Sequence, residues 1–175
     1  MIAAILLKFT RLEQQKLNLR SELSTWSEAE LQRRPTPDSW NVTDILDHLI
    51  KIEEPLPGSV RHTLPKQHRV ELLHHAALKF VNAVAGSRLR VKVPRKGSRF
   101  LPDSTESFAE IFARWDAVRA DIQRSLLTVK AEQLPYGLYL HPFGFWLTLD
   151  GALDLVTAHI RHHEYQFERL KSLPR

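Results

Sequence analysis

The chain has 175 residues, of which 43% are hydrophobic and 26% charged, and it contains no cysteine. This length favours one folded domain over residues 1–175, with enough apolar side chains for a substantial core. The lack of cysteine excludes disulfides and thiolate ligands, so a bound metal would need His, Asp or Glu. No apolar run approaches the roughly 18 residues of a transmembrane helix, so no membrane association is expected.

The N-terminal segment and the charge distribution give further expectations. The segment MIAAILLKFTRLEQQ lacks a basic start and a small-residue cleavage site, so it predicts a helix rather than a signal peptide. Without cysteines or an export signal, a cytoplasmic protein is favoured. The net charge is +5. One basic patch stands out, made of Arg88, Arg90, Lys92, Arg95, Lys96 and Arg99. It fits a solvated loop, a site that attracts an anionic small molecule, or nucleic-acid binding, which ranks last because no recognition motif is present.

The first half of the chain predicts two amphipathic helices. Apolar residues recur at helical spacing over 4–26, and the prolines of RRPTPDSW stop that helix. Asn41 or Thr43 can cap the second helix. Its apolar residues extend to Ile52, and the sequence PLPG at 55–58 is expected to end it.

The second half predicts three more helices. One covers about 66–85, with Phe80 among its expected core residues, and the basic segment 86–103 follows as a long loop. Asp103 or Ser104 is expected to cap a helix that reaches about residue 128. After a loop within 133–151, the last helix covers about 148–171. No sustained strand alternation is present. The pattern predicts an all-α four-helix bundle with an additional helix in the connection after the second helix.

Three histidines are the leading candidates for a functional site. His159 and His163 on the last helix have H-x3-H spacing, and residues four apart lie on one helix face. At about 100° per residue, both fall on or beside the apolar stripe, whereas His162 points toward solvent. His48 falls at the edge of the apolar face of the second helix. Two imidazoles from one helix and a third from another would form an open metal site of the catalytic kind.

Other interpretations of the histidines stay open. A histidine beside an apolar face is often an ordinary core residue, whose cost of burial a hydrogen-bond network removes as well as a metal does. His74 is a rival third ligand. His141, next to Pro142, is a candidate for the mouth of a site, whereas His62 and His68 are expected at the surface.

Two segments of the chain resemble the DinB superfamily, also described as DinB/YfiT-like metal-dependent enzymes. SWNVTDILDHL at 39–49 resembles that family's tryptophan, capped helix start and ligand histidine. HPFGFWLTLDGALDLVTAHIRHHEYQFERL at 141–170 resembles its His-Pro, glycine and H-x3-H-x2-Q-x2-R-L pattern. The order of segments between them is also similar, with a proline-bearing connection and then an amphipathic helix. Phe167 stands where the family commonly has isoleucine, which is a core substitution.

The resemblance implies an up-down-down-up bundle, a homodimer, and a divalent metal, zinc or nickel, on His48, His159 and His163. It also implies a thiol-dependent S-transferase or hydrolase that acts on small electrophilic substrates with a low-molecular-weight thiol such as bacillithiol or mycothiol. Gln166 is a candidate helper, and Asp44 and Asp47 are candidate carboxylates behind the ligands, unless these side chains belong to a solvated face. The alternative function is a metal-binding or ligand-binding stress-related protein without turnover.

Overall fold

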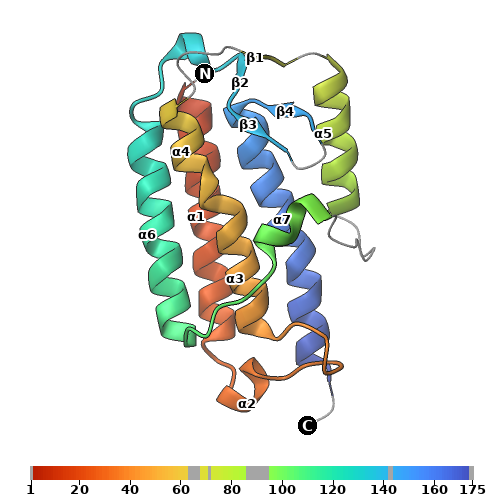
Figure 1. Cartoon of the computed structure of the whole chain (residues 1–175). Helices are drawn as coiled ribbons and strands as arrows, with labels where there is room; N and C mark the ends of the chain where they lie inside the picture. The colour runs from red at the N-terminus through yellow and green to blue at the C-terminus, as the bar shows by residue number, and fades with distance from the viewer. Residues whose placement is uncertain (1, 63–67, 71, 86–94, 142–143, 174–175) are drawn as a thin grey trace.

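Four long helices form the body of the protein in a computed structural model that describes residues 2–62, 68–70, 72–85, 95–141 and 144–173. They are α1 (Ile2–Leu23), α3 (Val42–Glu53), α6 (Phe108–Leu126) and α7 (Leu149–Lys171). Helix α1 contacts α6 and α7, and α3 contacts the same two helices, so the four close into a bundle. Figure 1 shows α1 and α7 running in one direction and α3 and α6 in the other. The predicted bundle with an up-down-down-up order is confirmed.

Shorter helices complete the fold. Helix α2 (Glu28–Leu31) lies in the connection after α1, and α4 (Pro55–His62) follows α3 and packs on α6. Helix α5 (Leu72–Ala85) is the additional helix expected after the second one, and it packs along α7. The 3-10 helix η1 (Arg95–Phe100) lies against α3, and η2 (Ala131–Gln133) follows α6.

Two small antiparallel pairs of strands occupy regions where the sequence predicted only helix or loop. Strand β1 (His68–Arg69) pairs with β2 (Tyr136–Gly137), and β3 (Tyr139–Leu140) pairs with β4 (Trp146–Leu147). The turn of the second pair contains Gly144, whose φ of 86° lies in the left-handed region that favours glycine. Strands of two residues are too short to show alternation in the sequence, so this difference has a simple physical reason.

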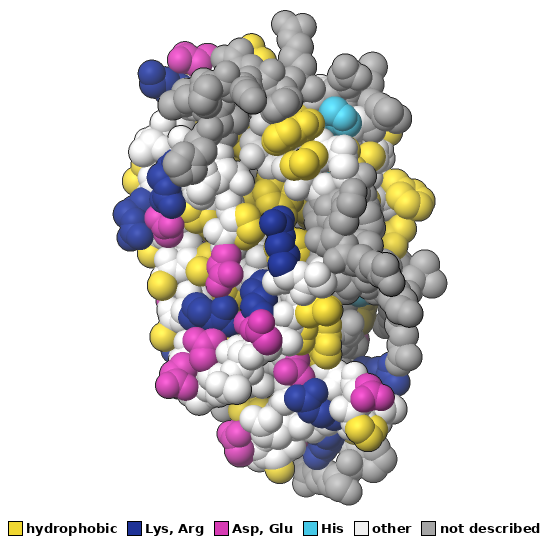
Figure 2. All heavy atoms as spheres, viewed as in Figure 1, with side chains coloured by type: hydrophobic (Ala, Val, Ile, Leu, Met, Phe, Trp, Pro, Cys, Tyr) yellow, Lys and Arg dark blue, Asp and Glu magenta, His cyan; other side chains and the backbone are white. Residues whose placement is uncertain are grey.

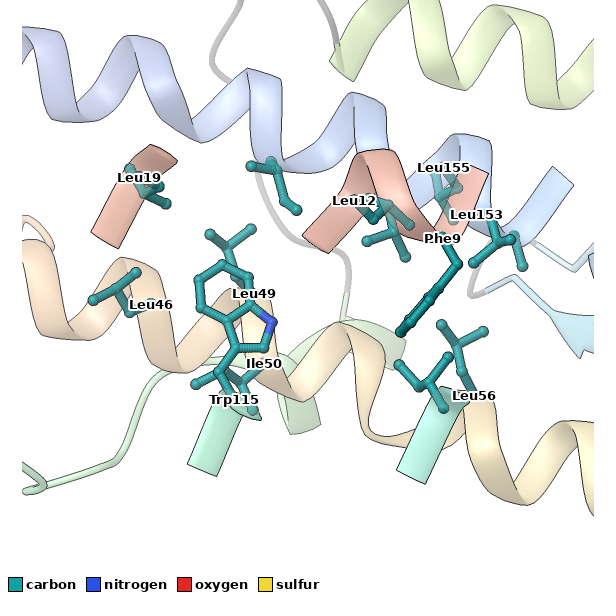
Figure 3. Close-up of a cluster of buried hydrophobic side chains, with 14 of the residues drawn as sticks. Phe9, Leu12, Leu19, Leu46, Leu49, Ile50, Leu56, Trp115, Leu153 and Leu155 are labelled. Atoms are coloured by element: carbon teal, nitrogen blue, oxygen red, sulfur yellow. The ribbon is translucent and has the colours of Figure 1, made fainter. Parts of the chain in front are cut away.

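The hydrophobic core lies between the four long helices. Figure 3 shows side chains of α1, α3, α6 and α7 pointing toward one another, among them Phe9, Leu49, Trp115 and Leu153. Each of these four residues is buried. Helix α5 approaches the start of α7 closely at Gly151, where a Cβ would lie 2.8 Å from the Leu78 side chain. The absence of a side chain at this position lets the additional helix pack directly on the bundle.

The interior also contains a cluster of ion pairs between α1, α3 and α6. The Arg119 guanidinium donates to the Glu53 carboxylate, with an Nη2–Oε1 distance of 2.8 Å, and also to Glu13. Lys16 lies 3.0 Å from Glu13 and 2.7 Å from Asp116. Lys16, Glu53 and Arg119 are buried, and because each of them faces an opposite charge, these three groups need no external partner.

The surface carries both signs of charge. On the face in Figure 2, Lys and Arg side chains are interleaved with Asp and Glu side chains over the bundle. Within the described ranges, no helix combines the length and the apolar character that crossing a bilayer requires.

Helix α3 ends at Glu53, just before Pro55, as predicted. The separate helix α4, which was not predicted, begins at Pro55, because the first turn of a helix needs no backbone N–H donor from that residue. Two other local predictions were wrong. Helix α6 begins at Phe108 after a Ser107 capping box instead of at Asp103 or Ser104. The Phe80 side chain is 71% exposed, and Leu78 is buried in its place.

Candidate metal centre

The three candidate histidines are carried by two helices that pack against each other. Helix α3 begins at Asn41, whose side chain accepts from the Asp44 N–H while the Asp44 carboxylate accepts from the Asn41 N–H. This capping box fixes the start of α3 and therefore the position of His48 two turns later. Helix α7 begins at the Thr148 cap and presents His159 and His163 toward α3.

The structure brings the Nε2 atoms of the three histidines together. His159 Nε2 lies 2.9 Å from His48 Nε2 and 3.2 Å from His163 Nε2. One ligand nitrogen from each ring can be chosen so that all three lie within 4.8 Å of one another. In a tetrahedral zinc site with bonds of about 2.0–2.1 Å, neighbouring ligand atoms are separated by roughly 3.3 Å. The donor set therefore fits a divalent cation of that size.

Hydrogen bonds on the outer side of two rings determine which nitrogen carries the proton. His48 Nδ1 lies 2.6 Å from the Phe100 carbonyl oxygen, and His163 Nδ1 lies 3.0 Å from Gln166 Oε1. Both oxygens are acceptors, so both Nδ1 atoms must be protonated donors. In the neutral rings, the Nε2 atoms of His48 and His163 then carry lone pairs that face the centre.

The centre is left with more acceptors than donors. A neutral His159 protonated at Nε2 could donate to His48 or to His163, but a single N–H cannot satisfy both. A hydrogen-bond network among the three rings thus leaves at least one buried lone pair without a proton. A cation can accept all three lone pairs, so the arrangement matches metal ligation better than a closed histidine network.

The electrostatics of the cluster favour neutral imidazoles. Burial, assisted by the nearby His48, lowers the pKa of His159 to about 3. Burial and the neighbouring imidazoles hold the pKa of His163 well below its ordinary value. Burial also lowers the pKa of His48, although the Phe100 carbonyl opposes this shift. Neutral imidazole is the form that binds metal, so protons would not compete strongly at neutral pH.

Aromatic rings surround the cluster. The half-buried Trp40 ring lies 4.9 Å from the His48 ring and stacks on His163 at 6.2 Å, measured between ring centroids. His162 lies outside the group of ligand atoms, as the helical geometry predicted, but its ring contacts the edge of His163 at 5.2 Å. His141 stacks on Phe145 at 4.6 Å. Trp40 thus packs on two of the three clustered histidines.

The candidate helpers occupy different places. The Gln166 amide oxygen accepts from His163 Nδ1, so this side chain orients a candidate ligand and does not form a separate polar contact in the site. Asp44 instead belongs to the cap of α3 and pairs with Arg34 at 2.6 Å. Asp47, which directly precedes His48 in the sequence, is buried. Its carboxylate accepts from the backbone N–H groups of Asp103 and Ser104.

The rival residues do not join the cluster where they are described. His74 is half-buried on α5 and is absent from the group of converging ligand atoms. The side chains of His62 and His68 lie outside the described part of the chain, as do Pro142 and most of the basic patch. Arg99 is the described member of that patch, and its guanidinium lies 4.6 Å from the centre of the Phe100 ring.

Two contacts of the site depend on tertiary structure more than on any signal in the sequence. The Phe100 carbonyl is a backbone group, which any residue type would supply, so no sequence signal marks it. Trp40 had a weak signal, because it directly precedes the cap of α3, but its packing on two histidines depends on how the helices pack. Gln166 was accessible to sequence reasoning because it lies three residues after His163 on the same helix.

Comparison with known proteins identifies the family of the chain. The family model for the DinB superfamily matches residues 11–167, and the chain belongs to this superfamily. The chain is also similar to the uncharacterized protein YuaE of Bacillus subtilis (strain 168). The two are 24% identical over 162 residues, which cover 89% of this chain and 92% of that protein. No solved structure gives a significant match.

Proposed function

We propose that this protein is a metal-dependent enzyme in which His48, His159 and His163 hold one divalent cation, zinc or nickel. The observation that carries the proposal is the convergence of their Nε2 atoms, with distances of 2.9 Å and 3.2 Å from His159. Three protein ligands leave a coordination position open, which is typical of catalytic rather than structural zinc sites. Membership of the DinB superfamily supports this function without specifying a reaction.

The reaction that we propose is transfer of a low-molecular-weight thiol to a small electrophilic substrate, or hydrolysis of such a substrate. A divalent cation supplies a Lewis acid that lowers the pKa of a water molecule or thiol. In the transfer, the thiol releases its proton to solvent and its sulfur forms a bond to an electrophilic carbon. The bond from that carbon to its leaving group breaks, and the leaving group takes the electron pair. A chain without cysteine has no thiol of its own to compete.

The protein's own residues would prepare this chemistry. The Phe100 carbonyl and the Gln166 amide oxygen hold two imidazoles in the tautomer that presents Nε2 to the centre. An imidazole whose outer N–H is hydrogen-bonded is a more basic and better oriented ligand. Trp40 covers one side of His48 and His163, which lowers the local polarity and strengthens electrostatic interactions at the centre.

Metal analysis tests the first part of this proposal. Protein stripped with a chelator and then loaded with zinc or nickel should hold about one ion per chain by elemental analysis. His163→Ala should lose the ion, because it removes one of three ligands. His162→Ala is the matched control, since it removes the adjacent imidazole and should keep the ion. Equal retention by both variants would contradict the proposed ligand set.

Thiol conjugation tests the second part. Metal-loaded protein is incubated with monochlorobimane and each of a panel of thiols that includes glutathione, bacillithiol and mycothiol, and fluorescence of the conjugate is recorded. The expected result is a rate above the uncatalysed one with at least one thiol, which disappears in His163→Ala and persists in His162→Ala. Tight metal binding without turnover of any thiol or hydrolysable electrophile would favour the stress-related binding protein instead.

A further inference from the structure

Residues 100–104, which form the end of η1 and the first part of its connection to α6, are attached to α3 by a series of polar contacts. The Phe100 carbonyl accepts from His48, and the Leu101 carbonyl accepts from Lys51 Nζ at 2.8 Å. The backbone N–H groups of Asp103 and Ser104 both donate to Asp47 Oδ2, at 2.9 Å and 3.2 Å. Asp47, His48 and Lys51 of α3 thus hold backbone groups of four of the five residues in this segment. We call Asp47 and Lys51, with the segment 101–104 that they hold, the α3 clamp.

The two charged side chains of the clamp are themselves fixed. Asp47 is only 1% exposed, and its second carboxylate oxygen accepts from the Arg114 guanidinium. Lys51 is 14% exposed and lies 3.1 Å from Asp47 and 2.5 Å from the Asp103 carboxylate. Charge-assisted hydrogen bonds of this kind are stronger than neutral ones, and burial of Asp47 limits competition from water. The clamp is therefore a stiff support for the backbone at residue 100.

The position of the Phe100 carbonyl decides which ring nitrogen of His48 carries the proton and how the ring is oriented. This carbonyl is the acceptor that keeps the proton on Nδ1 and leaves the Nε2 lone pair directed at His159. If the carbonyl moved away, the proton could transfer to the other nitrogen and the ring could rotate. Either change would remove a ligand lone pair from the centre.

We propose that the α3 clamp positions the Phe100 carbonyl for His48 and thereby sets the metal affinity of the three-histidine centre. This inference rests on the proposed function, because it requires that a metal binds there. Asp47 and Lys51 are positioning residues that touch no ligand atom of the centre. Coupling also operates in reverse, since a metal on Nε2 makes the Nδ1–H a stronger donor to the carbonyl and so secures residues 100–104.

Metal titration of Lys51→Met tests the forward coupling. The variant removes the donor to the Leu101 carbonyl while keeping a long apolar stem. We expect zinc affinity, measured by competition with a chromogenic chelator, to fall by about tenfold or more, as for loss of other groups behind metal ligands. The visible spectrum of the cobalt-substituted protein should change in intensity or position, because it reports ligand geometry. Lys51→Arg, which keeps the charge and the donors, should restore most of the affinity and the spectrum.

Lys8→Met is the matched control. Lys8 also bridges two carboxylates, Asp150 and Asp154, at 2.6 Å and 2.7 Å, and both lie on the helix that carries His159 and His163. The same substitution there removes the same charge without touching the clamp. Zinc affinity and the cobalt spectrum should match those of the unmodified protein. An equal loss in both lysine variants, or no loss in Lys51→Met, overturns the proposal.

Hydrogen exchange tests the reverse coupling without any substitution, so it holds even if Lys51→Met does not fold. Zinc should slow exchange of the Asp103 and Ser104 amides, whereas the Gly151 amide, which donates to Thr148, should be unaffected. Unchanged protection of Asp103 and Ser104 in zinc-saturated protein contradicts the clamp. If the unmodified protein binds neither zinc nor nickel, the proposed function itself fails, and the two failures are thus distinguished.

Discussion

Two clusters that contain buried polar side chains lie on different sides of α3, and they differ in how the buried polar groups are satisfied. His48 points toward α7, whereas Glu53, five residues later and so about 140° around the helix, points toward α6. The ion-pair cluster around Glu53 is balanced, with three cationic and three anionic side chains. These are Lys16, Arg20, Arg119, Glu13, Glu53 and Asp116.

The histidine cluster is incomplete by comparison. Its outer nitrogens are satisfied by Phe100 and Gln166, but its inner nitrogens face one another with too few protons. A structural cluster satisfies its own polar groups, and a binding site leaves some of them for a ligand. This difference separates the two clusters better than burial does, because both contain side chains that are less than 5% exposed.

Removing one member of the ion-pair cluster should give the largest effect on stability. Arg119→Met leaves the Glu53 carboxylate buried without its main partner, and breaking a buried pair costs about 3–5 kcal/mol. The free energy of unfolding from urea denaturation should fall by that amount. The double variant Arg119→Met with Glu53→Leu should recover part of it, since no uncompensated charge remains. A loss below about 1 kcal/mol would show that the cluster is not balanced as described.

Adding metal should stabilise the protein through the histidine cluster alone. At a free zinc concentration 100 times the dissociation constant, the expected gain is about 2.7 kcal/mol. Thermal unfolding with zinc and with a chelator measures this gain as a shift in Tm. The shift should vanish in His163→Ala and persist in Arg119→Met. Loss of the shift in Arg119→Met alone would mean that the two clusters are not independent.

Acid should weaken the metal-free protein because its buried histidines resist protonation. The pKa of His48 and of His163 is lowered in the folded state, so the unfolded chain binds more protons below its pKa near 6.5. The contribution of these neutral histidines to the free energy of unfolding is therefore fully present above that pH. It falls as the pH decreases, by up to about 1.4 kcal/mol per pH unit for each histidine. Urea denaturation between pH 7 and pH 5 should show this slope. It should flatten in His163→Asn but not in His75→Asn, whose side chain is exposed on α5.

Loss of the Gln166 contact should have the smallest effect. Gln166→Leu removes the acceptor of the His163 Nδ1–H, and we expect about a tenfold weaker affinity for zinc, the lower limit for such groups. Gln166→Glu keeps an acceptor and should retain the affinity. Gln15→Leu is the control. It removes a side-chain amide of α1 that donates at 3.0 Å to Glu164, a residue of α7 next to His163 in the sequence. Chelator competition measures all three, and equal affinities throughout would remove Gln166 from the site.

The amino-acid sequence alone determined the helical class and the direction in which the key side chains point. The apolar spacing predicted the four long helices, and Asn41 was among the predicted caps of α3. The H-x3-H spacing placed His159 and His163 on one face and directed His162 away from them, because helical geometry is local and nearly invariant.

Tertiary structure decided what these side chains meet. Phe80 lies on the helix that the periodicity predicted, yet α5 packs on α7 through Leu78 near Gly151 and leaves Phe80 exposed. The meeting of His48 with His159 depends on how α3 packs against α7, across 111 residues of sequence. The Phe100 carbonyl that sets the His48 tautomer is a backbone atom without a sequence signature. Helix periodicity fixes directions within one element, whereas distances between elements arise only when the whole core packs.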